Sequence, residues 1–421
     1  MFHINLLKDK PSLLKGSLYS LFSFINQGAS FLLLILLANY IQPAEYGMLS
    51  MFNTLVQLVT FFIAFSTSGY ISVSYFRKEF QEFRSDFSSI MLLGGISIIM
   101  VVTVFGIFHT SISNVLNISA PFVWLSLVIC GTQFLHNVNL DIIRIQEKVY
   151  TYGFFSCACA GLNFVLSLIL VIGFNLSWQG RVYAQLIVML VFGFIAIILF
   201  YKGGYLTCHV STGRLKTIDL WGLPLIPHLA SNWIKQGCDR LIINSNYTIE
   251  ELGIFSFALN LTSIITMVGF GFNQVNSVDI YKILGSKEYD NISKLKMLNK
   301  QRWNILKIYA VAYIVIVVGC VWGVPILLPK YSGSVLYIIP LSIYGFGVCA
   351  YLLYCNFLFY YGENRKIMMI TFCSSVLHLL LSLFLTRYSL LLTSAIYIVT
   401  QAYIVIAVYH QSSKILSANL A

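Results

Sequence analysis

Charged residues are scarce along this chain of 421 residues. Only 10% of the residues are Asp, Glu, Lys or Arg, whereas 58% are hydrophobic. A soluble domain carries about a quarter charged residues, so this shortage excludes an ordinary soluble enzyme or binding domain. The shortage also extends over the whole length of the chain, which leaves almost nothing to form a part outside a membrane.

Sequence motifs for nucleotide binding and hydrolysis are missing as well. There is no Walker A loop, no Gly-x-Gly-x-x-Gly, no His-Glu-x-x-His and no Gly-x-Ser-x-Gly. These motifs position phosphates, zinc or a nucleophilic serine. The nine cysteines include no Cys-x-x-Cys pair, and inside apolar runs cysteine behaves as a small hydrophobic side chain. We therefore predict that the protein is not an enzyme, contains no ATPase, and uses neither a metal nor a cofactor.

Long apolar runs are what the sequence does have. Each run between polar breaks is long enough to cross a bilayer, which takes about 20 residues. The sequence thus predicts an all-α integral membrane protein with about twelve transmembrane helices. The predicted spans are 18–41, 47–73, 88–108, 119–140, 153–174, 182–201, 221–245, 253–276, 304–328, 334–360, 367–386 and 390–410.

The distribution of Lys and Arg predicts how these spans are oriented. Of the 26 basic residues, only Arg181, Lys330 and Arg387 fall in loops on one side, while Lys235 and Arg240 fall within a span. All the others lie on the side that carries the N-terminus. Because basic loops stay in the cytoplasm, we predict a multi-pass protein of the bacterial cytoplasmic (inner) membrane with both termini cytoplasmic. The same rule explains the net charge of +11 without any binding to nucleic acid.

A short internal repeat predicts two related halves. Ala44–Ser50 resembles Glu250–Ser256 at an offset of 206 residues, close to half of the chain. We therefore expect an N-terminal six-helix half over 1–201, a cytoplasmic linker over 202–219 and a C-terminal six-helix half over 220–421. Six helices in each half give both halves the same orientation, related by an axis along the membrane normal around a central cavity.

The seventh span carries the candidate functional site. Lys235 and Arg240 lie inside an apolar run, and charged residues at such depth normally face a bundle interior or a wet cavity. We interpret them as ligands for an anionic group, with Asn232 and Gln236 as neighbours. Asp239 either holds the two cations or titrates during transport. The alternative is a structural ion pair, because Lys235 and Asp239 lie four residues apart on a helix.

Uncharged polar residues recur at helical spacing in other spans. Asn26, Asn53, Gln57 and Asn260 are the amides that we assign to a substrate-binding lining. Together they suggest a lining that suits sugar hydroxyls better than ions, although for each residue alone hydrogen bonding between helices is the better explanation. His109, His209 and His378 are isolated in the sequence and are interpreted as packed or interfacial histidines.

Four segments of the chain carry a family resemblance, namely Leu37–Gly47, Arg144–Tyr150, Leu223–Arg240 and Glu250–Phe255. In these segments the chain resembles a bacterial polysaccharide flippase of the O-antigen (Wzx) type, within the multidrug/oligosaccharidyl-lipid/polysaccharide exporter superfamily. In the fourth segment, Phe255 replaces the family's usual Tyr.

The resemblance implies transport of an undecaprenyl-diphosphate-linked oligosaccharide, as in lipopolysaccharide O-antigen or capsule biosynthesis. The repeat unit would pass from the cytoplasmic to the outer leaflet by alternating access. A glycan polymerase and a chain-length regulator are implied as working partners, with membrane lipid around the chain. From the family pattern we carry over only Lys235, Asp239 and Arg240 as functional residues.

Two other functions remain as alternatives. A multidrug or cation exporter of the same superfamily predicts an acidic cavity, whereas the seventh span has two cations and one Asp. A membrane-embedded glycan polymerase needs catalytic groups on an outer loop of some length, and the outer loops here, such as Thr110–Ile118, are short.

Overall fold

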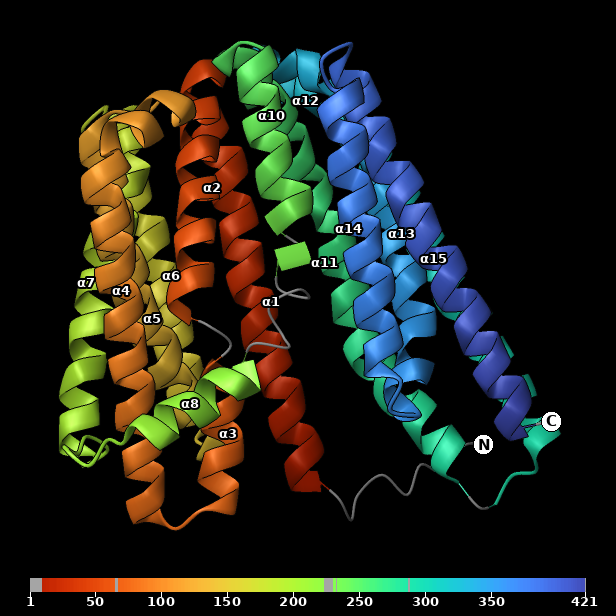
Figure 1. The fold of residues 1–421 in the computed structure, drawn as a ribbon. Coiled ribbons are helices and arrows are strands. Elements are labelled where there is room, and N and C mark those ends of the chain that lie inside the picture. Colours follow the sequence, from red (N-terminus) through yellow and green to blue (C-terminus); the bar gives the residue numbers. More distant parts are fainter. Residues whose placement is uncertain (1–9, 65–66, 223–229, 232, 287, 421) are drawn as a thin grey trace. The chain divides into compact units, whose positions relative to one another are not determined.

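The computed structural model describes residues 10–64, 67–222, 230–231, 233–286 and 288–420. Within these residues all secondary structure is helical (Figure 1), and eleven helices are long and apolar enough to cross a membrane. The prediction of an all-α membrane fold is confirmed. The seventh predicted span, 221–245, has no counterpart among these eleven. It includes residues 223–229 and 232, which lie outside the described part of the chain.

The described chain divides into two compact units. Unit 1 contains residues 1–41 and 51–229, and unit 2 contains residues 42–50 and 230–421. The helix α2, Pro43–Ala64, therefore begins in unit 2 and continues in unit 1. The other helices of unit 1 are α1 Lys10–Ala38, α3 Thr67–Arg77, α4 Phe80–Leu116, α5 Ala120–Ile145, α6 Val149–Leu168, the π-helix η1 Ile169–Gly173, α7 Ser177–Lys202 and α8 Thr212–Gly222.

Unit 2 is built around α11 and α13, which pack against α12 and α15. Its described helices are the π-helix η3 Ile234–Cys238, α10 Asp239–Asn246, α11 Ile249–Gly285, α12 Asn291–Leu327, the 3₁₀-helix η4 Pro329–Ser334, α13 Val335–Tyr360, α14 Asn364–Leu385 and α15 Leu390–Leu420. Several of these helices extend beyond the predicted spans, because hydropathy marks the apolar part of a helix and not its last hydrogen bond. Both α11 and α12 have 37 residues, well above the ~20 that a bilayer requires.

The repeated segments have the same local structure at the start of two helices. At the start of α11, Glu251 accepts a hydrogen bond from the backbone N–H of Thr248 at 3.0 Å, one half of a capping box. At the start of α2, Glu45 accepts the equivalent bond from the backbone N–H of Gln42 at 2.9 Å. The repeated acidic residue therefore satisfies a backbone donor that the first turn of a helix leaves unpaired.

Inside unit 2 these two helix starts cross backbone to backbone. A Cβ atom added to Gly47 would lie 2.0 Å from the carbonyl oxygen of Ile249, and one added to Gly253 would lie 1.8 Å from that of Pro43. Glycine is required at both positions because no other residue allows so close an approach. The hydroxyl of Ser50 donates to that of Ser256 at 2.9 Å, again between residues 206 apart.

The helix α8 is fastened to the ends of α3 and α4 within unit 1 (Figure 1). The carboxylate of Asp86, 1% exposed, pairs with Lys78 at 2.6 Å and with Arg214 of α8 at 3.0 Å. Ahead of α8, the backbone N–H of Thr207 donates to Ser88 Oγ at 2.8 Å. The segment that leaves α7 is thus bound to unit 1 by both charge and hydrogen bonds.

Candidate functional site

The three charged residues of the predicted site occupy consecutive turns of η3 and α10 in unit 2. All three are buried: Lys235 is 7% exposed, Asp239 1% and Arg240 4%. Lys235 lies in the π-helical turn, and π-helical turns often occur at functional sites. A Cβ atom on Gly237 would lie 2.6 Å from the indole Nε1 of Trp233, so a larger residue at this position would displace the indole ring. Three charged side chains, Lys235, Asp239 and Arg240, are thus buried in the interior of unit 2.

Asp239 is held by two side chains of α14. His378 Nε2 lies 2.8 Å from Asp239 Oδ2, and the hydroxyl of Ser382 donates to Asp239 Oδ1 at 2.6 Å. On the other side of the imidazole ring, His378 Nδ1 lies 3.1 Å from the hydroxyl of Thr400 on α15. The carboxylate is therefore satisfied on both oxygens by unit 2 itself.

Lys235 makes no ion pair with Asp239 within 4.0 Å in the part of the chain that the structure describes. Its ammonium group instead donates to the hydroxyl of Ser374 at 3.2 Å. The hydroxyl of Tyr397 donates to the backbone carbonyl of Lys235 at 3.0 Å, which ties η3 to α15. The structural ion pair between Lys235 and Asp239 considered from the sequence is thus replaced by a pair between Asp239 and His378, and the hydrogen-bond partner of the Lys235 ammonium is a neutral hydroxyl.

Arg240 is the least satisfied of the three ions. Its Nε and Nη1 atoms are buried and have no hydrogen-bond partner among the described residues. Tyr46, Tyr397 and Asp239 lie within electrostatic range of its charge, and Tyr46 is itself fixed by Asn260, whose amide donates to it at 2.7 Å. A buried donor without a partner costs about 1–3 kcal/mol, and more when it is charged. An anionic group would satisfy these donors.

The other predicted residues are distributed over both units. Asn26 donates to the hydroxyl of Ser156 on α6 in unit 1. In the same unit Asn53 is partly buried and Gln57 is exposed, both on α2. Gln236 lies next to Lys235 in η3 and is partly buried. Asn232 lies outside the described residues. The structure therefore brings Lys235, Gln236, Asp239, Arg240 and Asn260 into one unit, and Asn26, Asn53 and Gln57 into the other.

The sequence reasoning missed His378 as a functional candidate, because it was treated as an isolated histidine. It lies on a polar stripe of α14, where Ser374, His378 and Ser382 recur every four residues and all are fully buried. Residues spaced by four share one face of a helix. That spacing was the signal that was available in the sequence.

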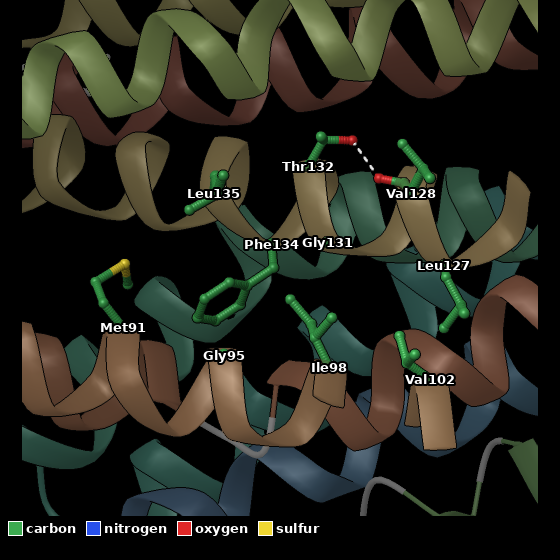
Figure 2. A pocket seen from close by; sticks show the side chains of 10 residues that line it. All are labelled: Met91, Gly95, Ile98, Val102, Leu127, Val128, Gly131, Thr132, Phe134 and Leu135. Atoms are coloured by element: carbon green, nitrogen blue, oxygen red, sulfur yellow. Dashed lines mark hydrogen bonds between the residues drawn. The ribbon is translucent and has the colours of Figure 1, made fainter. Parts of the chain in front are cut away.

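Unit 1 contains an apolar pocket between α4 and α5 (Figure 2). Its volume is about 410 Å³, and Figure 2 shows Ile98 and Phe134 directed toward each other across it. Thr132 supplies the only side-chain polar atom in its lining, and that hydroxyl donates to the carbonyl of Val128 at 2.7 Å. The pocket suits hydrocarbon and not a charged or sugar group.

The helical fold, with its eleven candidate spans among the described residues, defines a multi-pass membrane protein. The chain belongs to a family described as polysaccharide biosynthesis protein, which residues 13–276 match. It is similar to "Lsg locus putative protein 1" of Haemophilus influenzae, with 24% identity over 366 residues that cover 83% of this chain and 84% of the relative. The resemblance to polysaccharide flippases that was drawn from the sequence is confirmed.

Solved structures of transporters and flippases share the fold. The lipid II flippase MurJ in an inward closed conformation has a TM-score of 0.72 and 14% identity, covering 96% of this chain and 89% of its own. An inward-facing multidrug resistance MATE family transporter of the MOP superfamily has a TM-score of 0.70 and 15% identity, covering 94% and 95%. At such identity the likeness concerns the arrangement of helices into two bundles.

Proposed function

We propose that the protein is a flippase that moves an undecaprenyl-diphosphate-linked oligosaccharide repeat unit from the cytoplasmic to the outer leaflet by alternating access. The observation that carries the proposal is the buried Arg240, whose Nε and Nη1 have no hydrogen-bond partner among the described residues. A diphosphate is the part of such a substrate that accepts charge-assisted hydrogen bonds from a guanidinium. Membership of a polysaccharide biosynthesis family supports a glycan as the cargo.

The net charge of the site favours an anion. Asp239 is already engaged by His378 and Ser382, so it does not neutralise Lys235 by direct contact. Two cations then remain in one apolar unit, where a buried charge is stable only with a partner. This is the opposite of what a cation exporter needs, and it makes the exporter the weaker alternative. We propose that the amides Asn232, Gln236, Asn260, Asn26, Asn53 and Gln57 contact the glycan.

Asp239 and His378 are proposed as the coupling group that takes up a proton. The hydroxyl of Thr400 has a single hydrogen and three possible acceptors, which are His378 Nδ1 at 3.1 Å, the carbonyl of Ile396 at 2.8 Å and the carbonyl of Tyr397 at 3.4 Å. When this hydrogen points to Nδ1, the imidazole is neutral. When it points to Ile396, Nδ1 is free to carry a second proton. Rotation of one hydroxyl therefore accommodates both protonation states of the pair in a buried site.

The proposed lipid-linked glycan also implies partner proteins. A polymerase and a chain-length regulator would use the flipped repeat unit at the outer leaflet, in a bacterial inner membrane. A membrane-embedded polymerase is the second alternative. Polymerisation of the glycan by the purified chain alone would favour it over the flippase.

The test is translocation of an undecaprenyl-diphosphate oligosaccharide in vesicles containing the purified protein. We expect Arg240→Gln and Lys235→Gln each to lower the rate by about 10- to 100-fold, because each removes a charged hydrogen bond worth ~1.5–3 kcal/mol. Insertion and folding are checked by size exclusion and thermal unfolding.

The matched control is Arg387→Gln, which removes a cation of unit 2 that stacks on the ring of Tyr388 at 4.8 Å. It should translocate at the wild-type rate. Wild-type rates for both site variants would eliminate the assigned anion site. Efflux of a cationic dye, with no movement of the lipid-linked glycan, would replace the flippase by the exporter.

A further inference from the structure

Unit 1 contains a cation, Arg181, that is not part of the proposed anion site in unit 2. Arg181 lies in the first turns of α7, near the point where α6 passes through η1 into α7. Its Nη1 donates to Asn163 Oδ1 at 2.7 Å and lies 3.4 Å from the hydroxyl of Ser167, both on α6. Within the described part of the chain, no carboxylate lies within 4.0 Å of this partly buried guanidinium.

The sequence of unit 1 confirms that this charge has no neighbour of opposite sign nearby in the chain. No Asp or Glu occurs between residues 148 and 218, so α6, η1 and α7 contain none. The acidic residues of unit 1 are Asp9, Glu79, Glu82, Asp86, Asp141, Glu147 and Asp219. The neutral oxygens of Asn163 and Ser167 hold Arg181 in position without cancelling its charge.

Arg181 also terminates a line of polar contacts along one face of α6. Tyr152 meets the ring of Tyr19 of α1 at 5.0 Å, and Ser156 accepts the hydrogen bond of Asn26. Asn163 and Ser167 follow at the same face, since a spacing of seven or eleven residues returns to one side of a helix. The line therefore runs along α6 from Tyr152 to a cation at its far end.

Both hydrogen bonds of Arg181 to the described residues use Nη1. The Nε–Nη2 edge of the guanidinium therefore has no partner among these residues, and it is an edge that binds carboxylates and phosphates through two parallel hydrogen bonds. A structural tie between two helices does not need a full charge, because a neutral donor such as Gln forms the same bond to Asn163.

We propose that Arg181, positioned by Asn163 and Ser167, is a binding site for a phosphate-type anionic headgroup in unit 1. The proposal rests on the proposed function in one respect: the anion is taken to be the diphosphate of the lipid-linked glycan. In the predicted orientation Arg181 lies at the outer end of unit 1. The diphosphate then meets one buried cation site in unit 2 and a second in unit 1, at the end where it leaves the protein.

Two substitutions separate an anion site from a helix tie. Arg181→Gln removes the charge and keeps a donor for Asn163. Asn163→Asp keeps an acceptor for Arg181 and turns the tie into an ion pair, which neutralises the guanidinium internally. A helix tie predicts that Asn163→Asp is as stable and as active as the wild type. An anion site predicts that it is stable and does not bind the anion.

The experiment measures binding of farnesyl diphosphate to the purified full-length protein in detergent, with thermal unfolding as the check on folding. We expect Arg181→Gln and Asn163→Asp each to weaken binding about tenfold or more, the loss typical of one charge-assisted contact. The matched control is Arg77→Gln, which removes an exposed cation at the end of α3 in the same unit. It should bind as the wild type does.

Wild-type affinity in both site variants would overturn the proposal, and so would a wild-type protein that does not bind the probe. Competition by phosphatidylglycerol as strong as by farnesyl diphosphate would support the anion site and assign it to a phospholipid headgroup. The binding assay is independent of translocation. Retained binding in a protein that fails to flip the glycan would therefore refute the proposed function and leave this site intact.

Discussion

At the scale of single residues, the buried ions differ in how completely unit 2 satisfies them. Asp239 has a partner on each carboxylate oxygen, whereas Lys235 has one hydroxyl and Arg240 keeps two donors without partners among the described residues. Desolvation makes each unmet charge costly. The unmet charges are both positive, which is why the proposed ligand is an anion, and the satisfied one is the proposed coupling residue.

A substitution of Asp239 tests this division of roles. Asp239→Asn keeps a polar contact for Ser382 and removes the negative charge that the pair with His378 requires. We expect it to bind the lipid-linked diphosphate at least as tightly as the wild type, because the site loses one negative charge. Translocation should no longer accelerate under an imposed proton gradient. The measurement compares rates in vesicles with and without that gradient.

Asp290→Asn is the control, since Asp290 is a fully exposed residue ahead of α12. Its response to the gradient should be unchanged. An Asp239→Asn protein that accelerates under the gradient as the wild type does would remove Asp239 from the coupling mechanism.

At the scale of elements, two junctions hold together helices that are far apart along the chain. In unit 1, Asp86 fastens α8 to α3 and α4. Partial burial lowers the pKa of Lys78, but the hydrogen bond and negative charge of Asp86 outweigh this effect and raise that pKa above its usual value. The ammonium therefore stays charged throughout the neutral range. In unit 2, Gly47 and Gly253 let the starts of α2 and α11 cross with their backbones in contact.

The glycine crossing predicts a large effect from one methyl group. In Gly253→Ala the new Cβ would lie 1.8 Å from the Pro43 carbonyl oxygen, so one helix start must shift. Overpacking of this kind lowers the free energy of unfolding by about 1–3 kcal/mol. Gly161→Ala on α6 is the control, because nothing lies within 4 Å of its added Cβ. Alanine is the better helix former there, by up to about 1 kcal/mol.

The comparison is made by thermal unfolding of the purified variants. Equal unfolding temperatures for Gly253→Ala and the wild type would mean that the two helix starts separate at little cost.

At the scale of the whole molecule, the segments between the eleven candidate spans are mostly short, and the longest of them is residues 203–248. The asymmetry of Lys and Arg among these segments predicts that both termini are cytoplasmic. Cys208 offers a native probe of this orientation, since it is exposed in the segment between α7 and α8.

The labelling experiment uses a variant in which Cys208 is the sole cysteine. We expect a membrane-impermeant maleimide to modify it only after the cells are made permeable. A second variant with Lys330→Cys as its sole cysteine should react in intact cells, because Lys330 is exposed in η4 at the opposite predicted side. The reverse labelling pattern would invert the orientation, and with it the direction that we propose for transport.

The sequence by itself determined the class of this protein and the main features of its fold. Hydropathy predicts membrane helices because a bilayer offers no partner for exposed backbone groups, so each span must be a helix of at least about 20 mostly apolar residues. The rarity of ions in such helices also drew attention to Lys235, Asp239 and Arg240. The repeat at Ala44–Ser50 and Glu250–Ser256 was visible as well, since capping acids and close-packed glycines are local requirements.

Only the tertiary structure decided which partner each ion has. Lys235 and Asp239 are spaced for an ion pair within one helix, yet Asp239 pairs with His378, 139 residues away. The sequence placed Arg181 in an outer loop, and only the structure shows that Asn163 and Ser167 of α6 hold its guanidinium in position. Helical spacing reports which residues share a face, but not which helix packs against that face. The balance of charge in a buried site depends on that packing, and with it the ligand that the site accepts.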